Sequence, residues 1–133
     1  MMRMVLAAVL ALVLTAPGKA QADDIQHVIG GQIEAFKVDD FATAFTFASP
    51  MIKRIFGTPE RFGMMVQQGY PMVWRPADVQ YLEQRAEGEV IYQKVLIEDA
   101  AGALFTFEYE MIPTPDGWQI NGVQRLQEPA VAA

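Results

Sequence analysis

The sequence contains no cysteine, one histidine (His27) and one serine (Ser49). Without cysteine the chain forms no disulfide and offers neither a thiolate metal site nor a cysteine nucleophile. A single histidine without a neighbouring cluster does not make a conventional zinc site. Ser49 precedes Pro50, so we expect its hydroxyl to cap a helix rather than to attack a substrate. These absences argue against metal-dependent and hydrolytic chemistry, and we expect no cofactor.

Basic residues are also scarce, with 10 Lys and Arg against 16 Asp and Glu. Lys53-Arg54 is the only adjacent basic pair, so the acidic average hides no cationic stripe. An acidic domain repels phosphate backbones, and binding to nucleic acid is therefore excluded from the functional hypotheses.

The first 22 residues have the pattern of a secretory signal peptide. Arg3 is followed by an apolar run over residues 5–14, by Pro17-Gly18 and by small residues at Ala20 and Ala22. The run is much shorter than the roughly 20 apolar residues of a membrane-spanning helix, so no stable membrane anchor is expected. We predict cleavage after Ala22 and a periplasmic or secreted protein, in which residues 23–127 form one domain and residues 128–133 a flexible tail. Cleavage leaves a net charge of −8, since residues 1–22 carry two basic and no acidic residues.

The first half of the predicted domain has helical periodicity. The apolar positions Ile25, Val28, Ile29, Ile33 and Phe36 recur every three or four residues, which places them on one stripe of a helix. Gly30-Gly31 lies inside that helix and weakens it, unless a close neighbour requires glycine there. Further helices are predicted to start at Asp39 or Asp40, at Ser49-Pro50 and at Thr58-Pro59, where capping residues stand before apolar positions. After Gly69, Pro71 and Pro76 predict an extended path.

The second half alternates as strands do. Strands are predicted from residue 79 to about 86, over 90–98 and 104–112, and from Trp118 onward. In the third of these, Phe105, Phe107, Tyr109 and Met111 share one face, while Glu108 and Glu110 lie on the other. Short turns join the strands, so the expected fold is α+β, with N-terminal helices packed on a bent antiparallel sheet.

Four segments together resemble a known family: "QIEAF", "DDFATAFTFASP", "FGTPERF" and "GWQINGV". The chain resembles the domain-of-unknown-function family 4864 of exported bacterial proteins over essentially all of its predicted mature length. That family looks like part of the nuclear transport factor 2-like superfamily, which implies a cone-shaped α+β fold. The superfamily includes both enzymes and plain binding modules, so the resemblance implies a fold and carries no site residue.

The predicted ligand-binding residues are aromatic side chains and one arginine: Tyr70, Trp74, Arg75, Tyr81 and Trp118. The first four lie in or beside the proline-bracketed segment, where an exposed backbone would present stacking and hydrogen-bonding groups at the rim of the sheet. Trp118 is expected mainly to close the sheet against the helices. No catalytic or metal-ligating residue is predicted, and Glu108 and Glu110 are expected to face solvent.

The leading functional hypothesis is a non-enzymatic module of the bacterial cell envelope that holds a small apolar ligand or a protein partner. The rivals are a cofactor-free isomerase or dehydratase-like enzyme and a structural homodimer without ligand. A homodimer through the sheet is expected because strand 90–98 is bulky on both faces. A cavity with a buried ionisable group favours the enzyme, a purely apolar cavity favours ligand binding, and a filled interior favours the interaction module.

Overall fold

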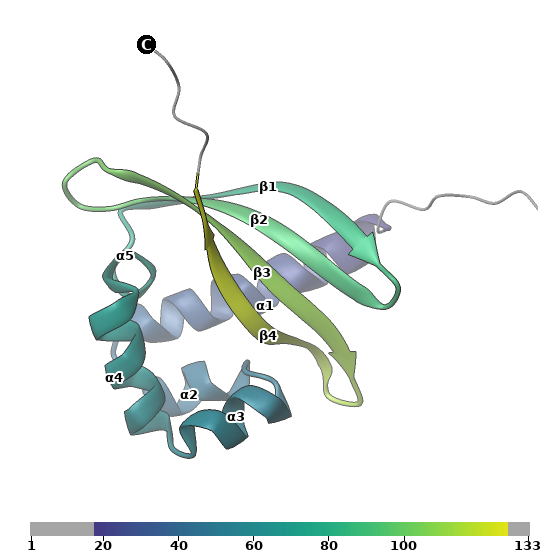
Figure 1. The fold of residues 1–133 in the computed structure, drawn as a ribbon, viewed down its shortest axis with the longest axis horizontal. Coiled ribbons are helices and arrows are strands. Elements are labelled where there is room, and N and C mark those ends of the chain that lie inside the picture. The colour runs from purple at the N-terminus through teal and green to yellow at the C-terminus, as the bar shows by residue number, and fades with distance from the viewer. Residues whose placement is uncertain (1–17, 128–133) are drawn as a thin grey trace, which may run out of the picture.

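The computed structural model describes residues 18–127, which form an α+β fold with five helices followed by a four-stranded antiparallel sheet. The helices lie on one side of the curved sheet, and the sheet does not close into a barrel (Figure 1). The elements are α1 (Lys19–Lys37), α2 (Phe41–Thr46), α3 (Pro50–Phe56), α4 (Pro59–Gly69), α5 (Pro71–Trp74), β1 (Asp78–Glu87), β2 (Val90–Glu98), β3 (Leu104–Thr114) and β4 (Gly117–Leu126).

The predicted helix starts are confirmed by their capping hydrogen bonds. Asp40 accepts a hydrogen bond from the backbone N–H of Thr43 at the start of α2, at 3.1 Å. Ser49 and Thr58 cap α3 and α4 in the same way, each followed by proline at the first helical position. The local sequence therefore determines where these helices begin.

The two glycines of α1 are explained by close neighbours. A Cβ atom on Gly31 would lie 2.7 Å from the ring of Phe47, and one on Gly30 would lie 3.2 Å from the hydroxyl of Tyr81. Real Cβ atoms do not approach other atoms as closely as 2.7 Å, so Gly31 lets the segment after α2 pack against α1. Packing against distant residues offsets the loss of helix propensity.

The extended path predicted for the segment after Gly69 is wrong. Residues 71–74 form the short helix α5, with Pro71 at its first position. Proline is tolerated there because the first N–H groups of a helix have no partner within the helix. Pro76 does agree with the end of α5 and the turn into β1.

The strands pair in the order β1-β2-β3-β4, each antiparallel to the next. The register shifts in β1 between Tyr81 and Gln84, and again where β4 pairs with Glu110 and Met111 of β3. Beyond β4 the sheet edge is extended by one parallel bridge, in which Ser49 N–H donates to the carbonyl of Ile120 at 2.8 Å.

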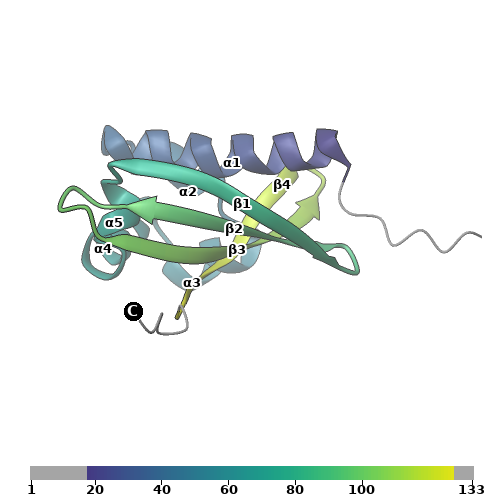
Figure 2. The same ribbon diagram turned by 90° about the horizontal axis from the view of Figure 1, so that it is seen from above.

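The two faces of the sheet differ as the alternation predicts. The inner face is the side that packs on the helices, and its central residues are Ile91, Gln93, Val95, Ile97, Phe107, Tyr109 and Met111. The outer face carries Tyr92, Lys94, Leu96, Thr106, Glu108 and Glu110. Helix α1 runs along the sheet and supplies a matching buried stripe that includes Ile25, Ile29 and Phe36 (Figure 2). The core is therefore a single layer between the helices and the inner face.

Two of the predicted segments lie wholly or partly outside the described range. Residues 1–17 of the predicted signal peptide and the predicted tail, residues 128–133, lie outside residues 18–127. From Lys19 onward the last residues of the predicted signal peptide form the first turn of α1. Across residues 18–127 no helix is long and apolar enough to cross a membrane.

Candidate functional site

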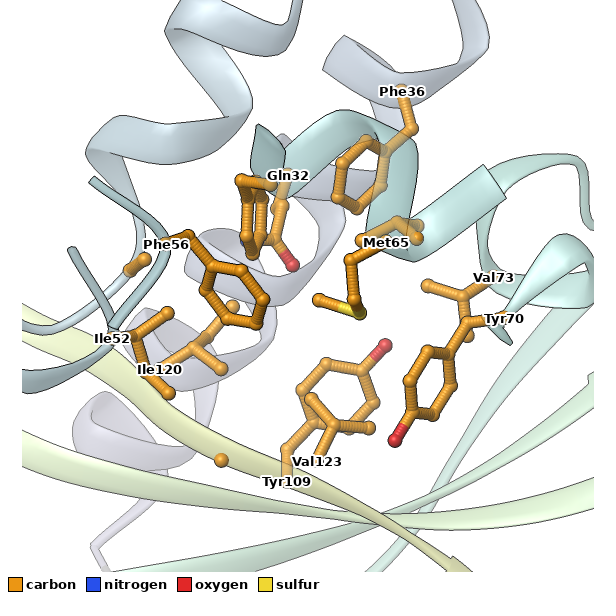
Figure 3. Close-up of a pocket in the computed structure, with 14 residues that line it drawn as sticks. Gln32, Phe36, Ile52, Phe56, Met65, Tyr70, Val73, Tyr109, Ile120 and Val123 are labelled. Atoms are coloured by element: carbon orange, nitrogen blue, oxygen red, sulfur yellow. The ribbon is translucent and has the colours of Figure 1, made fainter. Parts of the chain in front are cut away.

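The core layer contains a cavity of about 250 Å³ between the helices and the inner face. Its volume is close to the lower end of the range of about 300–1,000 Å³ that is usual for small-molecule sites. Helices α1, α3, α4 and α5 form one wall, and β3 with β4 forms the other (Figure 3). Most of the lining is apolar and includes Phe36, Ile52, Phe56, Met65, Val73 and Val123.

The sheet is irregular beside this space. Gly122 lines the cavity with its backbone where the register between β3 and β4 shifts, while a Cβ atom on it would face Glu110 on the outer face, at 4.0 Å. Ala48, in the segment that bridges to β4, is a small lining residue. The cavity therefore lies where the sheet departs from regular pairing.

Tyr109 supplies the cavity with a buried hydroxyl. Its side chain is fully buried, and its oxygen is the one buried side-chain nitrogen or oxygen atom of residues 18–127 that has no hydrogen-bond partner. Burial raises the pKa of Tyr109 well above its ordinary value, with smaller contributions from Tyr81 and Tyr70. The hydroxyl therefore keeps its proton at neutral pH and is a hydrogen-bond donor.

The neighbour of Tyr109 on β2 is fully satisfied. Gln93 is directly opposite Tyr109 in the sheet and is equally buried. Its amide nitrogen donates to the carbonyl oxygens of Leu82 (3.0 Å) and Lys94 (2.8 Å), and its amide oxygen accepts from Gln84. Two adjacent polar side chains on the inner face thus differ, since only the one that lines the cavity lacks a partner.

Gln32 is the other buried polar side chain in the lining. Its amide nitrogen donates to the carbonyl of Ala44 at 3.2 Å, which fixes the orientation of the amide. The amide oxygen, which can only accept hydrogen bonds, is directed toward the cavity (Figure 3). The cavity is therefore apolar apart from an amide oxygen and the hydroxyls of Tyr109 and Tyr70.

Among the five predicted ligand-binding residues, Tyr70 lines this cavity. It lies at the junction of α4 and α5, and its ring centroid is 6.1 Å from that of Phe107 on the inner face. The side chain is half-buried, so Tyr70 forms part of the wall nearest to solvent.

Trp74 and Arg75 lie outside the cavity lining and contact Asp39 instead. The indole N–H of Trp74 and the guanidinium of Arg75 both donate to one carboxylate oxygen of Asp39, at 2.8 and 2.9 Å. Arg75 also donates to the carbonyl of Phe36 at the end of α1 and stacks on the Trp74 ring at 4.0 Å. These hydrogen bonds, led by that from Trp74, lower the pKa of Asp39. The cluster ties the end of α1 to α5.

Tyr81 and Trp118 are also separate from the cavity lining. The hydroxyl of Tyr81 donates to the carbonyl of Gln26 in α1 at 3.3 Å, which links β1 to the helix. Trp118 is half-buried, pairs with Pro113 across the sheet and packs against the core. The structure thus distributes the five predicted residues over several places and brings only Tyr70 to the cavity.

The predicted positions of the two β3 acids agree with the structure in that both lie on the outer face. Glu108 accepts a hydrogen bond from Arg85 at 2.8 Å, and Glu110 accepts from Tyr92 at 3.1 Å and from Asn121. Both are half-buried by these partners rather than fully exposed. Neither lines the cavity.

Sequence reasoning missed Tyr109 and Gln32 as site residues. A signal was present for each, because Gln32 stands on the buried stripe of α1 and Tyr109 is the polar-tipped member of an apolar strand face. A polar atom at a core position needs a partner, and the sequence offered no way to see whether one exists.

No metal site is evident in the described part of the chain, where no three His, Cys, Asp or Glu side chains group together. The side chain of His27 is exposed on α1.

Comparison with known proteins gives one match. The family model described as "Domain of unknown function (DUF4864)" matches residues 18–133. No curated protein and no solved structure matches the chain. The relationship to the nuclear transport factor 2-like superfamily stays a prediction. Since the match covers most of the sequence, the chain belongs to the family described as Domain of unknown function (DUF4864).

Proposed function

We propose that this protein is a binding module that holds a small, mostly apolar ligand in the cavity between the helices and the inner face of the sheet. The observation that carries the proposal is a cavity of about 250 Å³ whose apolar wall contains a buried hydroxyl without a partner. Sites for small molecules combine an apolar lining with a few directed polar groups. The proposed place of action is the periplasm, in line with the predicted signal peptide.

The composition of the lining favours binding over proton chemistry. A general acid or base must exchange its proton near the working pH. The cavity lining contains no Asp, Glu, His, Lys or Arg among the described residues, and burial raises the pKa of Tyr109 still further from neutrality. Arg75 and Asp39 bind each other outside the cavity. An isomerase or dehydratase mechanism would therefore lack a base next to the bound molecule.

The open interior also favours a ligand over a purely structural homodimer. A protein that serves only to associate gains stability from a filled core, because each void loses packing contacts. This domain instead leaves a cavity of about 250 Å³ between its helices and the inner face. Dimerisation through the outer face remains a separate prediction that is compatible with a ligand.

The binding test is a titration of the mature protein with acetophenone, followed by amide chemical shifts in ¹H–¹⁵N NMR spectra. We expect saturable shifts at residues that line the cavity. A matched pair of variants locates the site: Val123→Phe projects a ring into the cavity, whereas Gln124→Phe places the same ring at the exposed neighbouring position. Binding should be lost in the first variant and kept in the second.

Native mass spectrometry of the protein purified from its own periplasm complements this titration, because it reports a retained ligand and the oligomeric state in the same spectrum. A wild-type protein whose cavity resonances do not respond to acetophenone, and which carries no ligand after purification, would contradict the proposal.

A further inference from the structure

We infer that the ligand is a neutral molecule whose oxygen atom accepts a hydrogen bond from the hydroxyl of Tyr109, while its apolar body fills the space between α3, α4 and β4. This inference rests on the proposed binding function and adds the chemical class of the ligand.

The position of the Tyr109 hydroxyl indicates that the ligand accepts a hydrogen bond. Tyr109 is fully buried and its oxygen has no partner, although the residue opposite, Gln93, has all of its hydrogen bonds. A buried donor without a partner loses free energy relative to water, and such groups are rare in folded proteins. In Figure 3 the hydroxyl of Tyr109 points into the space bounded by Met65 and Tyr70. An acceptor on a bound ligand would restore the missing hydrogen bond.

The absence of charged side chains among the described lining residues indicates that the ligand is neutral. None of the described lining residues is a cation, so an anionic group in the cavity would lose its hydration without a compensating ion pair. A neutral carbonyl or ether oxygen needs one donor only, and Tyr109 provides it. These constraints exclude carboxylates and phosphates and favour ketones, aldehydes, esters and ethers.

The volume sets the size of the ligand. A cavity of about 150 Å³ lined by Leu, Ile and Phe holds benzene. In proportion, the 250 Å³ available here fits on the order of ten non-hydrogen atoms. Aromatic lining residues such as Phe36, Phe56 and Phe62 suit a ligand that contains a ring or a short branched chain.

Two isosteric probes test the hydrogen bond. Acetophenone and α-methylstyrene have the same shape, and the carbonyl oxygen of the first is a methylene group in the second. Because the two compounds differ in hydrophobicity, the informative quantity is the ratio of their dissociation constants in wild type compared with the same ratio in Tyr109→Phe. We expect the preference for acetophenone to fall by about tenfold in the variant, which corresponds to one buried hydrogen bond.

Tyr92→Phe is the matched control, because it removes a hydroxyl from the outer face of the sheet, away from the cavity lining. The ratio should stay within about twofold of wild type in this variant. A ratio that is unchanged in Tyr109→Phe, or that falls equally in Tyr92→Phe, would overturn the assignment of the hydrogen bond to Tyr109. Failure of both probes to bind wild-type protein, together with the absence of a retained ligand after purification, would reject the proposed function itself.

Benzoate tests whether the cavity accepts an anion, since it has the size of acetophenone and carries a negative charge. We expect it to bind wild-type protein at least about tenfold more weakly than acetophenone. Benzoate that binds as tightly as acetophenone would overturn the restriction to neutral ligands, whatever the result with Tyr109→Phe.

Discussion

The inner and outer faces of the sheet alternate residue by residue along β3, yet they satisfy their polar groups in opposite ways. On the outer face, Glu108 and Glu110 are bound by Arg85, Tyr92 and Asn121. On the inner face, the side chains beside these acids are fully buried, and the hydroxyl of Tyr109 has no partner. The polar groups nearest to water are thus paired within the protein, while one far from water is not.

The difference shows where a ligand is needed to complete the structure. A solvent-exposed donor without a protein partner is bonded to water, so it does not indicate where a ligand binds. A buried donor in an apolar cavity has no such alternative, and it marks the position where an external acceptor gains most. For this reason the inner face is the better candidate for recognition, although the outer face carries more polar residues.

The largest effect on the free energy of unfolding is expected for a substitution at a packed position of the inner face. Phe107 is fully buried and contacts the ring of Tyr70. We expect Phe107→Ala to lower the free energy of unfolding by about 3–5 kcal/mol, because it removes a buried ring and leaves a void. Chemical denaturation followed by far-UV circular dichroism measures the change. Glu108→Gln, one residue away on the outer face, should lower stability far less, and similar losses in the two variants would contradict the assignment of faces.

A second prediction examines how much of the helical wall is tightly packed. A Cβ atom on Gly63 would lie 2.6 Å from the ring of Phe41, so the two helices α2 and α4 are in contact there. We expect Gly63→Ala to lower the free energy of unfolding by about 2 kcal/mol, since overpacking outweighs the gain in helix propensity. Gly69→Ala, at the end of the same helix, meets no atom within 4 Å and is the matched control. Thermal denaturation should show a loss for the first and none for the second.

The third prediction concerns the unpaired hydroxyl in the absence of ligand. We expect Tyr109→Phe to raise the free energy of unfolding by about 1 kcal/mol, because it removes a buried donor that has no partner. The raised pKa of Tyr109 also predicts how the stability difference between wild type and variant changes with pH. The folded state disfavours the ionised phenol, so the unfolded state loses this proton first, and the wild type should lose stability relative to the variant above about pH 10.

Urea denaturation at neutral and alkaline pH measures both effects. A variant that is less stable than wild type at neutral pH would mean that the hydroxyl of Tyr109 is already satisfied in the free protein. A variant that gains stability but loses selectivity for acetophenone would show that this position is optimised for binding at the expense of folding.

Much of this fold was predictable because its local signals agree with one another. Capping residues before proline determine the starts of α3 and α4, and the alternation along β3 separates Phe107 from Glu108. The start of α5 was missed because Pro71 has two structural meanings. Proline ends a preceding helix and also begins a following one, and its neighbours alone do not decide between them.

The site was less predictable because it depends on contacts between distant parts of the chain. Trp74 and Arg75 have the composition of a binding surface, but Asp39, 35 and 36 residues away in the sequence, occupies their donors. Tyr109 was correctly placed on the inner face. Whether its hydroxyl meets a partner depends on the side chains that distant elements bring around it, such as Met65 and Tyr70. Alternation predicts the direction of a side chain, while the space in front of it is a property of the whole fold.

The smallest expected effect lies on the outer face, at Arg85. Its guanidinium donates to Glu108 at 2.8 Å and to Glu87, and it stacks on the ring of Tyr92 at 4.1 Å. Arg85 is itself largely exposed, so water and salt screen these ion pairs and they contribute little to stability. We expect Arg85→Gln to lower the midpoint of urea denaturation only slightly, and the difference from wild type to shrink between about 0.05 M and about 0.5 M salt as the Debye length shortens.

Arg85→Lys keeps the charge but loses the paired hydrogen-bond geometry, and its midpoint should lie between those of wild type and Arg85→Gln. A loss as large as that of Gly63→Ala, or one that does not change with salt, would show that the outer face is more deeply buried in solution than in a single copy of the chain, as the predicted dimer through the sheet requires.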